Sequence, residues 1–318
     1  MKLYQNDIGW AEHLVATATP SVTLRSAVPP QLSRIPYARE LVKIRLRALL
    51  HWKQTPDWLG LLNSHPAFSE YLRNYPKFLY KVYRPYLSHA LTPAQRLETV
   101  RAHYAFMFRR GLGQTIAGAS LGPVVLAEVT GKSGLPYQIQ LRTVNTCERE
   151  GELALQLAQD GKVLTTVAFS VAPRDGVATI SVGCIQGGRS DDAREAIRAA
   201  TRDLHGMRPK QLMASLAQQL GHDYGCERMV MVSNRNRVIY KALRLGCVMA
   251  DYDQLWMELG ARTRADGDFE LDCAPIAAPD LAQIASKKRS EAKKRHELVR
   301  AMALQVSVGL RAREAAPH

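Results

Sequence analysis

The residues that most clearly suggest chemistry lie where one predicted helix ends and the next begins, at residues 206–210. Pro209 has the fixed φ that suits the first position of a helix, and Arg208 and Lys210 stand on either side of it. The first turn of a helix has unpaired backbone N–H groups and the positive end of the helix dipole. This pattern predicts an anion site formed by Gly206, Arg208 and Lys210, and the ligand that we expect there is a pyrophosphate.

Two carboxylates and a histidine are candidates for proton transfer. Glu150 and Glu152 are two residues apart in EREGELAL, so in a strand both side chains would point to one face, where one could be the general base for an attacking amine. Solvated carboxylates on a strand are the alternative. His205 lies beside the predicted anion site and could orient a substrate or move a proton, or it could merely cap a helix end. We predict Glu152 and His205 as catalytic residues.

Two consecutive glycines follow the strand that contains Cys184, directly after Gln186. Such a pair permits positive φ and the close approach of a ligand, although a tight turn from a strand to a helix needs the same residues. Gln186 is therefore a predicted ligand contact. Cys184 could be a nucleophile that carries an acyl group, but the sequence supplies no paired histidine, which favours a small buried residue.

The elements that would hold these residues follow one another as strand, helix, helix and strand. Residues 177–185 alternate and are β-branched, which predicts a strand. Asp191 or Asp192 can cap a helix that extends to about residue 204, and a second helix begins at Pro209. The apolar run at 229–232 predicts the last strand of this unit.

The rest of the chain divides into a helical, a β-rich and a second helical part. Thr92 and Pro93 begin one of the helices of the first part, and Asp160-Gly161 joins two alternating strands as a hairpin. The Gly and Pro residues after Trp256 indicate a loop. The sequence thus predicts an α+β fold with a helical N-terminal region at 1–110, an α/β domain at 111–280 and a basic C-terminal helix at 281–318.

Several sequence blocks identify a family. They include NYPKFLYKVYRPYL, EGELAL, GCIQGG, TRDLHGMRPK, VSN, WMELG and SKKRSEAKKR. In these blocks, which extend over most of the chain beyond about residue 70, the protein resembles the VirK/YbjX family of bacterial proteins. The resemblance implies an association with virulence and with the robustness of the cell envelope, and it implies no particular reaction.

The order of the predicted elements is also similar to the core of the GNAT N-acyltransferases. In that fold the helix after the central strand holds the pyrophosphate of coenzyme A, and a following Asn and Tyr approach the thioester. The resemblance implies that Asn234 contacts the cofactor and that Tyr240 is catalytic. It further implies an acyltransferase-like enzyme that moves an acyl group from acyl-CoA or from the thioester of acyl carrier protein to an amine or hydroxyl.

Charge is distributed unevenly along the chain. The net charge is +10 over residues 1–110, −2 over 111–280 and +6 over 281–318. Basic flanks suit anionic lipid, nucleic acid or an acidic protein. The alternative to an enzyme is therefore a non-catalytic cytoplasmic factor that binds a membrane surface, nucleic acid or a protein partner. Aromatic residues interleaved with cations at 71–86 could stack on bases, but helical spacing is more typical of a core, so nucleic acid is the less favoured partner.

Other features restrict the expected cellular location and chemistry of the protein. No apolar run approaches the roughly 20 residues that cross a bilayer, and MKLYQNDIGWAEHLV lacks a secretory apolar segment, so we expect a cytoplasmic protein, peripheral at the inner membrane. Five cysteines without CxxC spacing predict free thiols and neither a disulfide framework nor a metal site. We expect an anionic partner for the C-terminal helix at its six clustered cations, Lys287, Lys288, Arg289, Lys293, Lys294 and Arg295.

Overall fold

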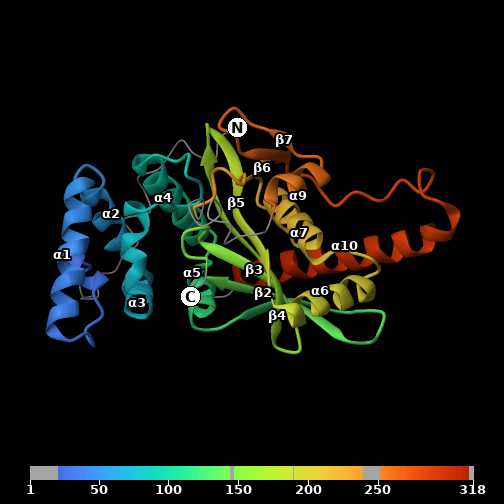
Figure 1. The fold of residues 1–318 in the computed structure, drawn as a ribbon, viewed down its shortest axis with the longest axis horizontal. Coiled ribbons are helices and arrows are strands. Elements are labelled where there is room, and N and C mark those ends of the chain that lie inside the picture. Colours follow the sequence, from blue (N-terminus) through green and yellow to red (C-terminus); the bar gives the residue numbers. More distant parts are fainter. Residues whose placement is uncertain (1–20, 144–146, 189, 239–250, 315–318) are drawn as a thin grey trace.

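The computed structural model describes residues 21–143, 147–188, 190–238 and 251–314. Its centre is an eight-stranded sheet with the order β1-β2-β3-β4-β5-β6-β8-β7. The neighbouring strands are antiparallel except β5 and β6, which are parallel. Figure 1 shows α4 and the helices before it on one side of the sheet, and α6, α7 and α10 on the other. The predicted α+β class is confirmed.

Helices fill the N-terminal part of the chain, as predicted. Thr92 begins α4 with a capping box, in which its side chain accepts from the N–H of Gln95 at 3.3 Å. The helical part extends past residue 110, because α5 follows and packs on β2. The bounds are η2 Leu24–Ala27, α1 Arg34–Leu50, α2 Thr55–Leu62, α3 Pro66–Asn74, η3 Pro76–Tyr83, α4 Pro93–Arg109 and α5 Gly113–Leu121.

Five strands in sequence form the antiparallel part of the sheet. Asp160 and Gly161 both have positive φ, at 49° and 73°, and join β3 to β4 in the predicted hairpin. Two-residue turns of this kind match the twist of the strands they connect. The bounds are β1 Val124–Thr130, β2 Pro136–Thr143, β3 Leu153–Gln159, β4 Lys162–Arg174 and β5 Val177–Gly187.

The predicted strand, helix, helix and strand follow as β5, α6 Asp191–Asp203, α7 Pro209–Asp223 and β6 Arg228–Met231. Pro209 occupies the first turn of α7. The predicted cap of α6 is wrong by one residue, because the side chain of Ser190 accepts from the N–H of Ala193 at 3.2 Å. Asp191 and Asp192 lie in the first turn instead, where carboxylates interact favourably with the helix dipole.

The segment after Trp256 is not only a loop. Helix α9 at Tyr252–Glu258 is followed by β7 at Arg262–Thr263 and β8 at Phe269–Asp272, which extend the sheet beyond β6. Sequence analysis missed these strands because they are two and four residues long and lie among glycines. The chain continues into α10 at Ser286–Glu314, the predicted basic helix.

Buried apolar side chains from Val22 to Leu310 form one cluster that includes both ends of the described chain. The aromatic residues at 71–86 belong to it, so the stacking of these rings on bases is excluded for the buried members. The division at residues 110 and 280 stays a prediction. Among the described helices, none is both long enough and apolar enough to cross a membrane.

Candidate functional site

The parallel pairing of β5 and β6 ends in the middle of the sheet. The two strands pair from Thr179 to Val182 on β5, and the N–H of Val232 still donates to the carbonyl of Val182 at 3.0 Å. Beyond this point the N–H of Ile185 bonds to the hydroxyl of Tyr252 at 3.0 Å rather than to β6. The carboxyl ends of parallel strands that diverge are a common place for ligands.

A β-bulge lies at Gly183, directly after the last residue of β5 that pairs with β6. Val182 pairs with Phe169 and Cys184 with Ala168, so β5 has one residue more than β4 between these pairs. A Cβ on Gly183 would be 2.1 Å from the carbonyl oxygen of Glu150. Only glycine therefore lets the backbone at Glu150 approach β5 this closely, which brings its carboxylate to Cys184.

Three buried groups meet beside the bulge. The Sγ atoms of Cys147 and Cys184 are 3.9 Å apart, and one oxygen of Glu150 and these two sulfurs all lie within 4.8 Å of one another. Burial raises the pKa of the Glu150 carboxyl, although hydrogen bonds from the thiols and the charge of Arg237 lower it. The hydrogen bond with Cys147, followed by burial and the charge of Glu150, raises the pKa of Cys184 well above its ordinary value. Cys184 is consequently a protonated thiol and not an activated nucleophile.

These groups are also of the types that bind metals. Two thiols and a carboxylate are ligands that Zn²⁺ accepts, whereas the spacing of the cysteines in the sequence predicts no metal site. Zinc binding would require both thiols to lose their protons. The raised pKa of Cys184 opposes this step in the metal-free protein.

Two cations lie next to the buried groups. Arg237 is 1% exposed, and its Cζ is 3.8 Å from the ring centroid of Tyr252. Lys210 is half-buried at the second residue of α7. Burial and the charge of Arg237 lower the pKa of Lys210, while Cys184 raises it. Two neighbouring cations at the start of a helix would be stabilised by an anion.

The other predicted anion ligands lie nearby but make different contacts. Arg208 precedes α7, and its Nη2 forms an ion pair with Glu258 Oε2 of α9 at 3.0 Å. The pair is largely exposed, so it contributes little stability and can exchange for a ligand. Gly206 has the positive φ of 75°, and Arg295 of α10 lies 3.7 Å from the position that a Cβ would take there.

Gln186 is near the end of β5 and Asn234 follows β6, and they make different contacts. The amide of Gln186 donates to Cys147 Sγ at 3.0 Å, so it belongs with the buried thiols. Asn234 donates to Asp251 Oδ1 at 2.8 Å and accepts from the N–H of Tyr252 at 2.9 Å. Its amide thus connects β6 to α9 and positions Tyr252. The implied contact of Asn234 with a cofactor stays a prediction.

The remaining catalytic candidates do not join this group. Glu152 precedes β3 instead of lying within it, and its carboxylate is buried in an ion pair with Lys81 at 2.8 Å. His205 lies near Lys132 and Lys294, whose charges, after burial, lower its pKa. The contacts of Glu152 and His205 are thus with other charged residues and not with the thiol that Gln186 contacts. Tyr240 lies outside the described residues.

Sequence analysis missed Cys147 and Arg237 as members of the site, and it named Glu150 only as the neighbour of Glu152. Cys147 and Glu150 come together with Cys184 only through the bulge at Gly183, which is a tertiary contact. Arg237 follows β6 in a run of polar residues, where nothing in the local pattern distinguishes it from a surface arginine. The sequence therefore contains no signal that identifies Arg237 as buried.

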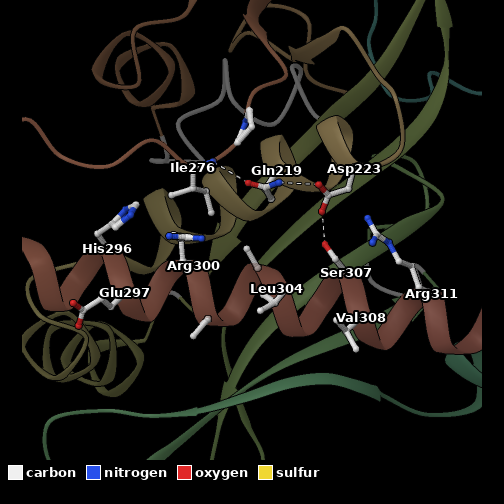
Figure 2. Close-up of a pocket in the computed structure, with 13 residues that line it drawn as sticks. Gln219, Asp223, Ile276, His296, Glu297, Arg300, Leu304, Ser307, Val308 and Arg311 are labelled. Atoms are coloured by element: carbon white, nitrogen blue, oxygen red, sulfur yellow. Dashed lines mark hydrogen bonds between the residues drawn. The ribbon is translucent and has the colours of Figure 1, made fainter.

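A separate groove of about 570 Å³ lies between α7 and α10. Figure 2 shows Gln219 and Asp223 of α7 facing His296, Arg300 and Ser307 of α10 across it. Gln219 donates to Asp223 at 2.8 Å, and the hydroxyl of Ser307 donates to the same carboxylate. Gln219, Asp223 and Ser307 therefore bind one another, and none of the predicted site residues lines this groove.

Comparison with known proteins gives relatives without an assigned reaction. A family model described as "Protein of unknown function (DUF535)" matches residues 34–308. The uncharacterized protein YbjX of Escherichia coli K12 is 29% identical over 275 residues, which are 85% of this chain and 83% of that protein. An uncharacterized protein of Haemophilus influenzae is 33% identical over 125 residues, 39% of this chain and 42% of its own length.

A more distant relative and one solved structure complete the comparison. The protein named membrane protein LapB of Mannheimia haemolytica is 23% identical over 219 residues, 69% of this chain and 92% of its own. A mutant of the cAMP-binding acyltransferase from Mycobacterium smegmatis overlaps 68% of this chain and 63% of that chain. Its TM-score is 0.30 and its identity 13%.

Proposed function

The chain belongs to the DUF535 family, as its resemblance to VirK/YbjX proteins predicted, and from the site we propose an acyltransferase-like enzyme that binds an acyl thioester between β5 and β6. One observation carries the proposal. The parallel pair ends at Val182, and α7 begins nearby with Lys210 close to Cys184. A cationic helix start beside the carboxyl ends of parallel strands suits a ligand with a phosphorylated end and a narrow acyl arm.

The cationic start of α7 would bind the carrier. Lys210 and the backbone N–H groups of α7 would hold the pyrophosphate of acyl-CoA, or the phosphate of the prosthetic group of an acyl carrier protein. Arg208 would exchange its ion pair with Glu258 for the same anion. Each charge-assisted hydrogen bond of this kind contributes about 1.5–3 kcal/mol.

Glu150 would take the catalytic part predicted for Glu152. Its raised pKa brings a carboxylate closer to the working pH of a general base. The amine or hydroxyl of the acceptor attacks the thioester carbonyl, the C–S bond breaks as the new C–N or C–O bond forms, and the proton that Glu150 takes from the acceptor returns to the leaving thiolate. Cys184 stays protonated and uninvolved in this direct transfer.

Thermal shift with coenzyme A, acetyl-CoA and inorganic pyrophosphate tests the binding half of the proposal. A ligand of the native state raises the melting temperature by mass action, and we expect such a rise for the parent protein. Lys210→Gln should abolish it, whereas Lys162→Gln, which changes an exposed cation at the start of β4, should not. Binding by none of the three ligands, or equal binding by the Lys210 variant, would refute the site.

Release of free thiol from acetyl-CoA tests the chemistry separately. A thiol reagent would follow the reaction in the presence of an amine acceptor, and Glu150→Gln should slow it by at least about a hundredfold, the usual scale for a general base. A variant that binds coenzyme A but releases thiol as fast as the parent would remove Glu150 from the mechanism and leave the binding site intact.

The second candidate is a non-catalytic cytoplasmic factor, peripheral at the inner membrane, that binds anionic lipid or a protein through its basic flanks. The observation that favours it is the exposure of five of the six clustered cations of α10, with Arg295 half-buried. One relative is named a membrane protein. Nucleic acid is less favoured, since most of the aromatic side chains at 71–86 are buried.

A further inference from the structure

Helix α1 exposes a stripe of large apolar side chains to solvent. At about 100° per residue, the stripe occupies an arc of roughly 60°, opposite the buried Ile44 and Ala48. An amphipathic helix normally turns its apolar face inward, but here a second apolar face points outward. Figure 1 shows α1 at one end of the molecule, with α2 and α3 between it and the sheet. The exposed fractions are 82% for Ile35, 55% for Val42, 56% for Leu46 and 69% for Leu49.

Cations border this stripe on both sides. On the same helical projection Arg34 and Arg45 lie along one edge, and Arg39 and Lys43 lie along the other. All four are exposed, and the acidic residue of α1 is Glu40. Leu50, the last residue of α1, exposes 78% of its surface, and Trp52, just beyond the helix, exposes 66%. Apolar side chains between rows of cations, with a tryptophan at one end, are typical of helices that lie in the interface of an anionic membrane.

A cationic cavity continues from one edge of the stripe. It has a volume of about 530 Å³, and Ile35, Arg39 and Lys43 of α1 line it together with Tyr80 of η3. The cationic groups around the ring are Lys43 Nζ at 5.9 Å, Arg47 Cζ at 5.9 Å and Arg84 Cζ at 5.4 Å from the centroid of Tyr80.

Carboxylates balance only part of this charge. Glu40 accepts from Lys43 at 3.2 Å and from the Tyr80 hydroxyl at 3.0 Å, and Arg84 pairs with Glu148 at 3.0 Å. Arg47 donates instead to the carbonyl of Tyr83 at 3.2 Å, a neutral acceptor. The cavity, which we call the Tyr80 cavity, therefore suits an anionic group.

We propose that the outer face of α1 and the Tyr80 cavity dock the protein on an anionic phospholipid bilayer. The apolar stripe enters the boundary between headgroups and acyl chains, and the cations at its edges contact lipid phosphates. The Tyr80 cavity, which shares Arg39 and Lys43 with the edge, receives a headgroup. This surface shares no residue with the proposed acyl-thioester site at the ends of β5 and β6, so the docking and the proposed acyl transfer can fail separately.

A second copy of the chain fits this surface poorly. Two α1 helices that paired through their stripes would bring cations to both edges of the contact, whether the helices ran parallel or antiparallel. Like charges that meet across an interface oppose association, whereas lipid phosphates neutralise them. The flanking charge thus favours the bilayer over self-association.

Vesicle co-sedimentation of the full chain tests the proposal. We expect the protein to sediment with vesicles of equal parts phosphatidylcholine and phosphatidylglycerol, and not with phosphatidylcholine alone. Leu46→Gln combined with Leu49→Gln should lower the partition coefficient at least about tenfold, because both side chains leave the apolar layer. The matched control is Leu304→Gln combined with Val308→Gln, two exposed apolar residues of α10, and it should bind as the parent does.

A charge variant and a fluorescence signal supply independent readouts. Arg39→Gln combined with Lys43→Gln should also lower binding, by about thirtyfold, since each cation near an anionic surface contributes about 1 kcal/mol. Arg198→Gln combined with Arg202→Gln on α6 removes the same charge elsewhere and should change binding little. Anionic vesicles should shift the tryptophan emission of the parent to shorter wavelength, and Trp52→Phe should remove this shift.

Several outcomes would overturn the proposal. They are no sedimentation of the parent with the mixed vesicles, equal sedimentation with both vesicle types, or losses in the α1 variants no larger than in their controls. Light scattering coupled to size-exclusion chromatography tests whether a second copy of the chain binds this surface instead. A parent dimer that the Leu46 and Leu49 variant converts to a monomer would assign the stripe to a second copy. All these variants change exposed side chains, and thermal melts would confirm that each is folded.

Discussion

Lys81 Nζ and Glu152 Oε1 lie 2.8 Å apart in an ion pair whose side chains are 3% and 1% exposed. The pair connects η3, in the helical part of the chain, to the residue that precedes β3. Tyr104 donates to the other oxygen of Glu152 at 2.9 Å, and the rings of Phe78 and Tyr86 lie under the ammonium group. Glu152 is therefore occupied by a contact that holds helices to the sheet.

Breaking this pair should destabilise the protein strongly. Glu152→Gln leaves the Lys81 ammonium buried without its counter-charge, and we expect the free energy of unfolding to fall by about 3–5 kcal/mol. Urea unfolding of the variant and the parent measures the difference. The double variant Lys81→Met with Glu152→Leu removes both charges and should lose less than the sum of the single variants.

The exposed pair of Lys132 and Glu291 is a matched control. Its Nζ and Oε1 atoms are also 2.8 Å apart, but the side chains are 42% and 48% exposed. Glu291→Gln should change the free energy of unfolding little, because water already solvates both charges. A Glu152→Gln variant as stable as Glu291→Gln would show that the buried pair does not stabilise the fold and would reopen a catalytic role for Glu152.

Local patterns predicted the elements that local chemistry determines. The start of α7 at Pro209, the turn at Asp160 and Gly161, and the start of α4 at Thr92 and Pro93 each depend on residues within one turn of one another. Their residue types restrict the backbone directly, so the sequence alone was sufficient. The two-residue strand β7 has no such signal, and its place in the sheet depends on its pairing with β8.

The candidate site depends on contacts that no local pattern contains. Lys81 and Glu152 are 71 residues apart, so the sequence gives no indication that Glu152 is neutralised. Sequence analysis considered Glu150 and Glu152 together, as neighbours on one face of a strand. The two carboxylates lie in different clusters because β3 begins only at Leu153. Lys210 was found for its place at a helix start. Its proximity to Arg237 and Cys184 could be known only from the fold.

A buried histidine should make the stability depend on pH. His103 is fully buried, its Nδ1 accepts from the N–H of Val171 at 3.1 Å, and burial lowers its pKa to about 3. Below pH 6.5 the unfolded chain takes up a proton that the folded protein does not, so this histidine lowers the stability progressively until the pH approaches 3. Between pH 7 and pH 5 the loss should be about 2 kcal/mol.

Urea unfolding at these two pH values measures that loss. His103→Asn retains an acceptor for the Val171 N–H but does not titrate. Between pH 7 and pH 5 the free energy of unfolding of the variant should therefore fall by about 2 kcal/mol less than that of the parent. The comparison within each protein cancels the cost of the substitution itself. Equal pH dependence in the parent and the variant would contradict a neutral buried His103.

The bulge at Gly183 should tolerate no side chain. In Gly183→Ala the new Cβ would meet the Glu150 carbonyl at 2.1 Å, so either β5 or the backbone at Glu150 must move. We expect a loss of about 2 kcal/mol or more in the free energy of unfolding, and a weaker thermal shift with coenzyme A than in the parent. Gly118→Ala, in helix α5 with no atom within 4 Å of the new Cβ, should instead be neutral or stabilising. Equal behaviour of the two variants would be evidence against the tight contact.

The last prediction separates the two basic surfaces. The clustered cations of α10 lie at residues 287–295, whereas its exposed large apolar residues are Leu304 and Val308, more than two turns further along. This part of α10 can attract an anionic membrane but has no large apolar side chain to insert into it.

Changing all six cations to Gln should therefore lower sedimentation with phosphatidylglycerol vesicles at low salt, and the difference from the parent should disappear near 1 M salt, where charges are screened beyond roughly 3 Å. The Leu46 and Leu49 variant of α1 should keep its deficit in any binding that persists at high salt. If the six-cation variant binds as the parent does at low salt, the C-terminal helix has no membrane-directed role; if it loses binding at every salt concentration, α10 contributes more than long-range attraction.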